Sequence, residues 1–541
     1  MTNATTGSDR VVPGQPPPAG ERDPRLARLV RLTMTDWQFA VVVLAAVLVR
    51  IIVVVGYPPI LWFNDSYNYV YDAVSHVPDQ IRPNGYPFFL DLLLPLHSAY
   101  PLALLQAAMG VAMGVAIYAL LRHRGLPWWG AALPTLPVLF DSYELHLEHM
   151  ITADPLFIFL VTIALVILCW SDRPSILVMA IAGLLIGYAA LVRSVGEPLL
   201  VVVLVGLLAR RVGWRRLATV LVAGIVPIVG YMFWFHASTG KYALTESSGT
   251  FLYGRVSTFA NCADIKPPAD LQILCDPTPP NMRPVAGEYI WADNELGSDP
   301  PTTPLWKLTQ SDDTSKRFTP QVNALTERFA KDAILAQPLD YLRVVTDDTL
   351  HTFRWNRQPD PNDYYGNGPA FQFVSGSEIN KLIPWWAGPA TPADLAAWTK
   401  QYGSDVTARQ VYAARQDFSG PGLGDTRVAA PWARLLQIYQ RYIYLRGTLL
   451  GIVVLIGVVG VLARWRRWGG IGLLPWLIGA LLLVLPPMTA GFSYRYVLAA
   501  VPAACLAAGL AFARRPGEKS VGALSADLRR HFGRGVAVEE E

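Results

Sequence analysis

The feature that most constrains the fold is a series of apolar blocks, most of them about 20 residues long, enough for a helix to cross a hydrocarbon core of roughly 30 Å. Backbone groups in lipid must be hydrogen-bonded within their own segment, so such blocks fold as helices. The chain of 541 residues is 52% hydrophobic and only 16% charged, which excludes an ordinary soluble protein. We therefore expect an all-α polytopic membrane protein.

Ten of these blocks are candidate membrane spans, although the third and sixth are short. Prolines at positions 134 and 137 predict a kink in the third. The first block follows a basic stretch, and no small-residue cleavage site comes after it, so we predict a retained span. The candidates are Trp37–Val55, Tyr100–Leu121, Gly130–Phe140, Ile151–Trp170, Ser175–Val192, Pro198–Leu208, Leu217–Phe235, Tyr444–Ala463, Ile471–Pro486 and Tyr496–Ala513.

Basic clusters beside the apolar blocks indicate the orientation of the chain. Lys and Arg accumulate on the cytoplasmic side of membrane spans, and placing every cluster there puts both termini in the cytoplasm. The clusters punctuate the spans and form no separate domain, so we expect no nucleic-acid partner. They are Arg25–Arg31, Arg122–Arg124, Arg210–Arg216, Arg464–Arg467 and Arg514–Lys519.

This topology divides the chain into five parts. We expect a basic, disordered cytoplasmic N-terminus, a membrane module whose first external loop covers 57–99, an extracytoplasmic domain of mixed structure between the seventh and eighth helices, the last membrane helices, and a cytoplasmic tail. Their expected bounds are 1–36, 37–236, 237–441, 442–514 and 515–541.

The four cysteines divide by location. Cys169 and Cys505 fall inside apolar blocks, where buried packing is the simplest interpretation. Cys262 and Cys275 lie in the expected extracytoplasmic domain, where oxidising surroundings favour a disulfide that closes a short loop.

Asp65 lies a few residues after the first apolar block, among aromatic residues. A carboxylate at this level of the membrane is placed to act on a substrate that arrives dissolved in lipid. The structural alternative is an interfacial helix whose aromatics lie at headgroup level and whose N-terminus is capped by Asp65. Both interpretations stay open on the sequence alone.

A second acidic segment joins the third and fourth blocks. Glu144 and Glu148 have the i, i+4 spacing of one helical face, which the two histidines of the segment do not share. A metal or acceptor site at Glu144, Glu148 and His149 stays open, although dedicated ligand spacing is absent. Asp154 precedes Pro155 in the first turn of the fourth block, where we expect its carboxylate to face an external cavity.

Arg193 and Arg495 lie at the external ends of spans, where basic residues are otherwise scarce. Ionisable groups at membrane level are costly and usually face a polar cavity. A guanidinium grips phosphate oxygens in bidentate fashion, whereas the alternative is simple snorkelling to lipid headgroups. For both arginines together, opposite an acidic cluster, a phosphate site is the better interpretation.

These residues resemble the GT-C class of integral-membrane glycosyltransferases, in particular the branch with the protein O-mannosyltransferases and the bacterial transferase that adds aminoarabinose to lipid A. The similarity covers the membrane half, to about Phe235, and the last span. Many relatives have paired acids in the first loop, whereas this chain has Asp65 followed by Ser66. The motifs, in matching order, are Asp65 itself, the basic-Pro-x-x-Tyr-Pro element Arg82–Pro87, the acid-Pro-Leu-Phe element Asp154–Phe157, Arg193, and the aromatic-Arg-Tyr element Tyr494–Tyr496.

The resemblance implies a multi-pass plasma-membrane enzyme of the cell envelope. It implies inverting transfer of a hexosyl or pentosyl group, such as mannose, from a polyprenyl-phosphate donor to a glycan, lipid or protein acceptor on the extracytoplasmic face. Asp65 is then the general base and Asp154 a second catalytic carboxylate. No cofactor is required by this chemistry, while a divalent cation, Mg²⁺ or Mn²⁺, stays open. The implied donor-binding residues are Arg82, Arg193, Arg495 and Tyr496.

Two other classes of protein fit parts of the pattern. A secondary transporter or lipid flippase suits about ten helices with polar residues at membrane level. Against it, the halves show no repeat, and the polar residues gather at the external ends. The other class is a non-catalytic membrane assembly protein whose external domain binds partners.

Overall fold

The computed structural model describes residues 36–291, 303–310, 314–357, 372–376, 406–420, 426–464 and 470–513. The expected cytoplasmic tail and, except for Asp36, the expected N-terminal segment lie outside these ranges, as do parts of 237–441. The regular secondary structure of the described residues is helical, and their one β-type contact is a single parallel bridge between Leu61 and Met150. The all-α class is confirmed, and the described part of the expected mixed domain is also helical.

Six helical segments in the described ranges are long and apolar enough to cross a membrane, and a pair bent by 57° raises the number to seven if it forms one span. Each predicted apolar block is helical, but the count of ten spans is not confirmed, because several of the helices are short. The six are α2 (Trp37–Gly56), α5 (Tyr100–His123), α9 (Ala153–Trp170), α12 (Trp214–Thr239), Gly470–Thr489 with α24 (Leu473–Thr489), and Tyr494–Ala511 with α25 (Tyr494–Leu498) and α26 (Val501–Ala511).

The remaining apolar helices are shorter or broken. The predicted third block is divided into α6 (Trp128–Ala132), a 3₁₀ turn and α7 (Leu136–Phe140), with proline in the first positions of the last two. Proline lacks the N–H that would continue the helix, which explains why the α-helix is interrupted here. The others are α10 (Ile176–Val192), α11 (Leu199–Ala209) and the bent pair α22 (Trp432–Tyr442) and α23 (Gly447–Leu462).

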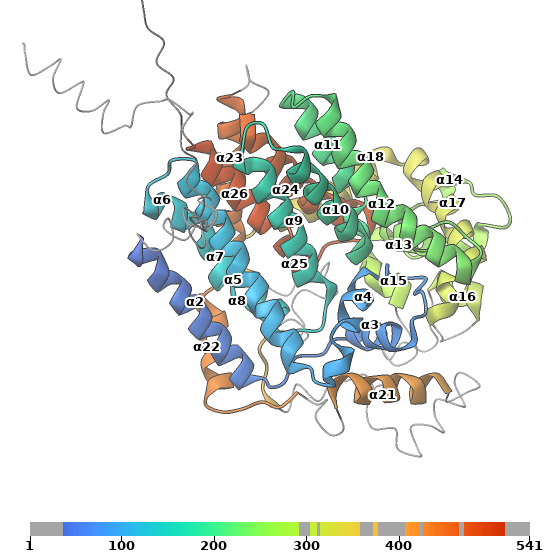
Figure 1. The fold of residues 1–541 in the computed structure, drawn as a ribbon. Helices are drawn as coiled ribbons and strands as arrows, with labels where there is room; N and C mark the ends of the chain where they lie inside the picture. The colour runs from blue at the N-terminus through green and yellow to red at the C-terminus, as the bar shows by residue number, and fades with distance from the viewer. Residues whose placement is uncertain are drawn as a thin grey trace, which may run out of the picture.

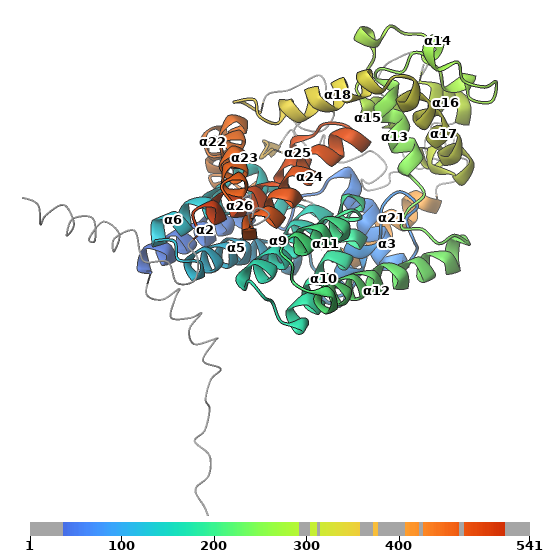
Figure 2. The ribbon, with the colours of Figure 1, turned by 90° about the horizontal axis from the view of Figure 1, so that it is seen from above.

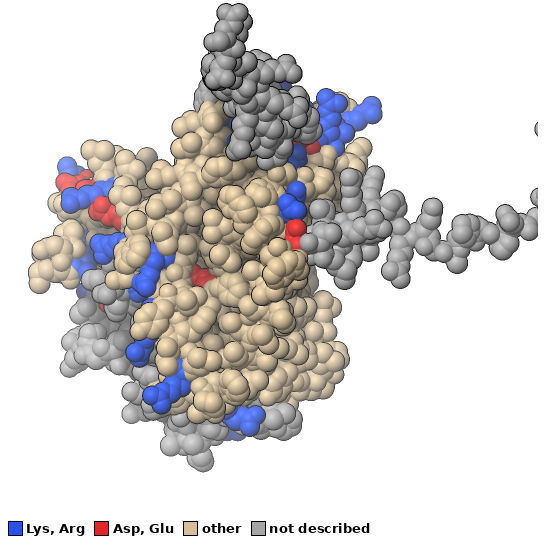
Figure 3. All heavy atoms as spheres, turned by 90° about the vertical axis from the view of Figure 1, so that its left-hand side faces the viewer, with Lys and Arg blue, Asp and Glu red and all other residues tan. Residues whose placement is uncertain are grey.

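The outer face of α2 matches a lipid environment. Its exposed side chains recur every three or four residues, so they form one apolar stripe along the helix. Figure 3 views the side of the molecule on which α2 lies in Figure 1, and it shows a broad area interrupted by few charged side chains. The stripe consists of Trp37, Val41, Leu44, Leu48, Ile51 and Val55, each at least 43% exposed.

Close packing against α12 fixes the position of the C-terminal half of α10. A Cβ on Gly183 would lie 2.5 Å from the carbonyl oxygen of Val220, and one on Gly187 would overlap the backbone of Gly224. Small residues spaced by four let two helix backbones approach closely in this way. The contact holds the C-terminus of α10, and therefore Arg193 directly after it, in a defined place.

Helices α13 to α18 gather on one side of the molecule, away from α2 and α6, as both ribbon views show (Figures 1 and 2). Their core contains buried Tyr253, Phe329 and Leu271. Their bounds are α13 (Ser248–Ser257), α14 (Cys262–Ile265), α15 (Ala286–Trp291), α16 (Pro304–Thr309), α17 (Pro320–Ala336) and α18 (Pro338–His351). The remaining helices are α3 (Asn64–Ser75), α4 (Gly85–Asp91), α8 (Ser142–Glu148) and α21 (Val406–Ser419), the last of which packs on α3.

A disulfide joins Cys262 to Cys275, with 6.0 Å between their Cα atoms. The closed loop spans a sequence separation of 13 residues. Since cross-linking restricts the unfolded chain, the C262S/C275S variant should lower the free energy of unfolding by about 3 kcal/mol. Thermal unfolding of the purified protein measures this loss. Reduction of the wild type should shift its Tm by the same amount, and an unchanged Tm in both would contradict the prediction.

Candidate active site

Asp65 lies in the first turn of α3, and hydrogen bonds fix the start of this helix against the start of α9. Ser66 Oγ accepts from the N–H of Phe63 at 2.8 Å and donates to the carbonyl of Ile151 at 2.6 Å. Leu61 continues the connection through backbone hydrogen bonds to His149 and Ile151. Ser66, which replaces the second acid of the resembled family, therefore joins the two segments that carry Asp65 and Asp154.

Asp154 occupies the first turn of α9, as its position before Pro155 predicts, and its side chain is 1% exposed. Thr152, the residue before the helix, donates its hydroxyl hydrogen to Asp154 Oδ2 at 2.7 Å. A carboxylate buried this deeply needs hydrogen bonds and positive charge around it. Three donor groups supply them: the Thr152 hydroxyl and the guanidinium groups of Arg193 and Arg495.

Three arginines connect the two carboxylates into one continuous network. Arg82 Nη2 lies 2.8 Å from Asp65 Oδ1, and Arg495 Nη1 lies 3.2 Å from Asp65 Oδ2. Arg495 also donates through Nε to Asp154 Oδ2 at 2.8 Å, and Arg193 pairs with the other oxygen of Asp154. Arg495 is thus the central member, because it alone among the described residues contacts both carboxylates.

The network lies at a cavity of about 420 Å³. Its polar wall includes Asp65 and the three arginines, and the guanidinium of Arg193 lies 5.2 Å from the ring centre of Tyr496. Its apolar wall is built from the end of α24 and the start of the last span. The apolar wall includes Leu482, Leu485, Pro486 and Ala499. A cavity with one charged and one apolar wall suits an amphipathic ligand.

The charges in this cavity are not balanced. Burial raises the pKa of Asp65, but Arg82 and then Arg495 lower it further, and the net pKa is below the usual aspartate value. Burial lowers the pKa of Arg193 to about 10, which still leaves it cationic at neutral pH. Three guanidinium groups against two carboxylates leave one net positive charge in the network.

Two further acids lie near the cavity. Asp79 lies 3.7 Å from Arg82, and burial raises its pKa despite that contact. Glu197 lines the cavity, and burial raises its pKa as well. The net positive charge of the three arginines and two carboxylates is what suits an anionic ligand.

The second acidic segment, which carries Glu144, Glu148 and His149, lies outside the cavity that Asp65 lines. Glu148 Oε1 pairs with Arg50 Nη2 of α2 at 2.6 Å, and a ring nitrogen of His149 contacts the carbonyl of Tyr57 at 2.8 Å. Glu144 is 3% exposed, and burial raises its pKa. Among the described lining residues of the cavity with Asp65, none belongs to this segment. Within the described ranges, no group of three or more His, Cys, Asp or Glu side chains is arranged to hold a metal ion.

The sequence analysis missed three residues: Thr152 and Trp291 beside the carboxylate–arginine network, and Arg50 at the second acidic segment. Thr152 has a sequence signal, since a threonine directly before a helix that opens with an acid is a typical N-cap position. Arg50 also has one, because an arginine inside an apolar span needs a buried partner. Trp291 has none: it comes from the external helices and lies under Arg82, with 5.9 Å from the guanidinium carbon to the ring centre.

No protein-family model and no curated protein matches this chain. Two solved structures are similar in part. A protein O-mannosyltransferase complex of S. cerevisiae, bound to the sugar donor, is 17% identical, with 43% of this chain and 38% of that chain covered and a TM-score of 0.31. The oligosaccharyltransferase of Archaeoglobus fulgidus, in complex with an inhibitory peptide and a dolichol-phosphate, is 13% identical, with coverage of 94% and 53% and a TM-score of 0.32.

This chain spans about half or less of the length of each of these structures. The first is an enzyme of the kind that the sequence motifs resemble. At these TM-scores the likeness is partial.

Proposed function

We propose that this protein is a membrane glycosyltransferase. It moves a hexosyl or pentosyl group from a polyprenyl-phosphate donor to an acceptor hydroxyl, with inversion, on the extracytoplasmic face of the plasma membrane. The observation that carries the proposal is the network of Arg82, Asp65, Arg495, Asp154 and Arg193 at one cavity that also has an apolar wall.

The donor, like the cavity, has one charged part and one apolar part. Its phosphodiester carries one negative charge, which matches the net charge of the five-residue network. Arg193 and Arg495 are the best placed to bind its oxygens, because a guanidinium offers paired donors to phosphate. The polyprenyl chain then lies along the apolar wall and continues into the bilayer, which agrees with access from lipid.

Asp65 is the proposed general base. Its carboxylate takes the proton of the acceptor hydroxyl while the hydroxyl oxygen bonds to the anomeric carbon of the sugar. The bond from that carbon to the phosphate oxygen breaks, and its electron pair leaves with the polyprenyl phosphate. Such a transition state resembles an oxocarbenium ion, and attack opposite the departing phosphate inverts the anomeric centre.

Donor binding itself activates the base in this scheme. In the structure both oxygens of Asp65 accept hydrogen bonds from arginines, which makes the carboxylate a weak base. A phosphate that takes hydrogen bonds from Arg495 weakens its pairing with Asp65 and raises the pKa of that carboxyl. The arginines meanwhile stabilise the charge that grows on the departing phosphate. No divalent cation is needed for this charge balance, so added Mg²⁺ or Mn²⁺ should leave the rate unchanged.

The direct test uses full-length protein in nanodiscs with labelled polyprenyl-phosphate sugars, hexosyl and pentosyl, and a mixed glycan, lipid and peptide acceptor set. We expect transfer from one of the donors, with the opposite anomeric configuration in the product. A protein that moves the labelled lipid across a proteoliposome membrane without any transfer is a flippase, which would overturn the proposal.

The pKa of Asp65 predicts a pH dependence. Because the arginines hold this pKa low, kcat/KM, which reports on the free enzyme, should be lost only as the pH falls below about 4, the usual aspartate value. The charge of Arg82 is the largest of the lowering effects. Arg82→Met should therefore move the acid limb of the kcat/KM profile to higher pH. An unmoved limb would show that another group sets it.

A further inference from the structure

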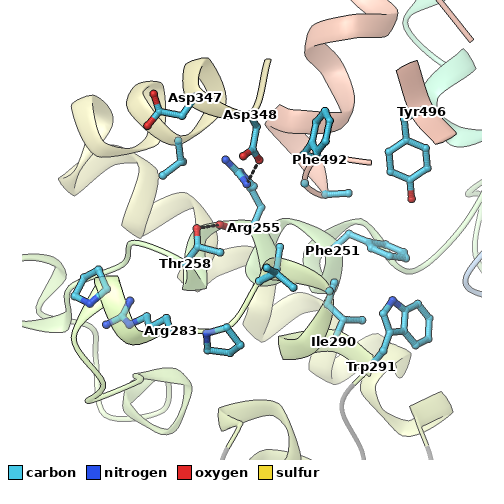
Figure 4. A pocket seen from close by; sticks show the side chains of 18 residues that line it. Phe251, Arg255, Thr258, Arg283, Ile290, Trp291, Asp347, Asp348, Phe492 and Tyr496 are labelled. Carbon is cyan, nitrogen blue, oxygen red and sulfur yellow. Dashed lines mark hydrogen bonds and ion pairs between the residues drawn. The ribbon is translucent and has the colours of Figure 1, made fainter. Parts of the chain in front are cut away.

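A second cavity, of about 250 Å³, adjoins the one described above. It lies between α13, α15, α18 and the turn that joins α24 to α25 (Figure 4). Phe251, Trp291, Ala490 and Tyr496 line both cavities, so the two are separated only by shared side chains. A ligand in the second cavity is therefore adjacent to the sugar end of a donor bound in the first.

The polar centre of the second cavity is Arg255, which is 4% exposed. Its Nη1 donates to Asp348 Oδ2 at 2.7 Å, the dashed pair in Figure 4. Its Nε and Nη2 are buried and have no hydrogen-bond partner among the described residues. A buried donor without a partner is unfavourable, so a ligand whose oxygens accept hydrogen bonds from Nε and Nη2 would be stabilised here.

Four aromatic rings lie on one side of this cavity. Figure 4 shows Phe251, Trp291, Phe492 and Tyr496 there, contributed by α13, α15, the turn before α25 and α25 itself. The negative face of an aromatic ring attracts C–H groups that carry partial positive charge, as a sugar ring offers them. Donors for hydroxyl oxygens beside aromatic faces are the combination that a carbohydrate needs.

The charge of the lining distinguishes this cavity from the first. Arg255 and Arg283 are matched in number by Asp347 and Asp348. Arg283 already donates to four backbone carbonyls, those of Thr278, Ser257, Ala260 and Asp276, so its guanidinium is occupied by the protein. A lining without net charge favours a neutral ligand over an anionic lipid or an acidic peptide.

We propose that the second cavity is the acceptor site and that the acceptor is a neutral glycan. One sugar is held by Arg255 and the aromatic rings, and the chain end passes the shared side chains Trp291 and Tyr496 to present its hydroxyl to Asp65. This inference rests on the proposed function, because it names the acceptor class of that same reaction.

Equilibrium binding tests the inference without any turnover. The probes are neutral linear hexasaccharides of glucose, mannose and arabinose, and separately polyprenyl phosphate, titrated into full-length protein in nanodiscs. Arg255→Lys keeps the charge beside Asp348 but removes the two free donors. Asp347→Trp fills the cavity mouth from a position that is 67% exposed, so it avoids the risk of a buried substitution.

We expect each variant to weaken binding of at least one hexasaccharide about tenfold or more and to change polyprenyl phosphate binding by less than about twofold. Arg328→Lys, at an exposed pair with Asp270 outside both cavities, is the matched control and should change neither. Unchanged hexasaccharide binding in both cavity variants, or no hexasaccharide binding to the wild type, would overturn the acceptor site.

Arg495→Lys separates this inference from the proposed function. It should weaken polyprenyl phosphate binding and leave hexasaccharide binding unchanged. If it changes neither while Arg255→Lys still weakens hexasaccharide binding, the donor assignment fails and the glycan site stands. If it weakens hexasaccharide binding as much as Arg255→Lys does, the second cavity is not the glycan site.

Discussion

Asp65→Asn should lower the rate of sugar transfer by about 100- to 10,000-fold, the range expected for loss of a general base. The amide has the shape of the carboxylate but cannot take the proton of the acceptor hydroxyl. Because one oxygen still accepts a hydrogen bond from Arg82 or Arg495, the folded structure should persist. Transfer of labelled sugar from a polyprenyl-phosphate donor, measured beside the Tm of the variant, checks both expectations.

The matched control for this variant is Asp72→Asn, on the same helix. Asp72 is 7% exposed, and burial together with Asp79 raises its pKa well above the usual value. It does not line the cavity with Asp65. We expect near wild-type transfer from it. Equal losses in the two variants would mean that α3 is merely sensitive to substitution and that Asp65 has no special role.

Arg495→Lys should reduce kcat about 100- to 1,000-fold, as loss of a group that stabilises developing negative charge does. The positive charge remains, but one ammonium group cannot replace Nε, Nη1 and Nη2, which contact Asp154, Asp65 and Thr152 together. The donor should also bind more weakly, which titration with polyprenyl phosphate measures.

Arg446→Lys controls for a conservative change at the outer end of a span. Arg446 directly precedes α23 and donates to the neutral side chain of Asn356 at 2.8 Å, away from the cavity. Its loss should leave kcat and donor binding unchanged. Wild-type kcat in Arg495→Lys would contradict the role proposed for the central arginine.

The sequence predicts the candidate site better than it predicts the number of spans. Asp65, Asp154, Arg193 and Arg495 all lie at ends of apolar blocks, and the basic clusters assign those ends to one side of the membrane. That placement is visible in the chain because span length and charge are local properties. The number of spans does not follow from the sequence in this way. Helices α10 and α11 are short, so whether they cross the membrane depends on how they pack against their neighbours.

The pairing inside the site has no local signal. Arg495 and Asp154 are separated by 341 positions, and only the folded chain shows that one guanidinium bridges two carboxylates. Glu148 does have a local signal for its partner, although its acidic neighbours left a metal or acceptor site open. The structure pairs it with Arg50, and an arginine within an apolar helix was the sequence feature that predicts such a partner.

In the proposed reaction, the arginines that bind the donor keep their positive charge after the sugar has been transferred. The released carrier is a phosphomonoester with up to about two negative charges, against one for the donor diester. Spent carrier should therefore compete with fresh donor, and steady-state turnover should follow how quickly the membrane removes it. On this proposal, the rate of transfer in a cell depends on carrier recycling as much as on the chemistry at the site.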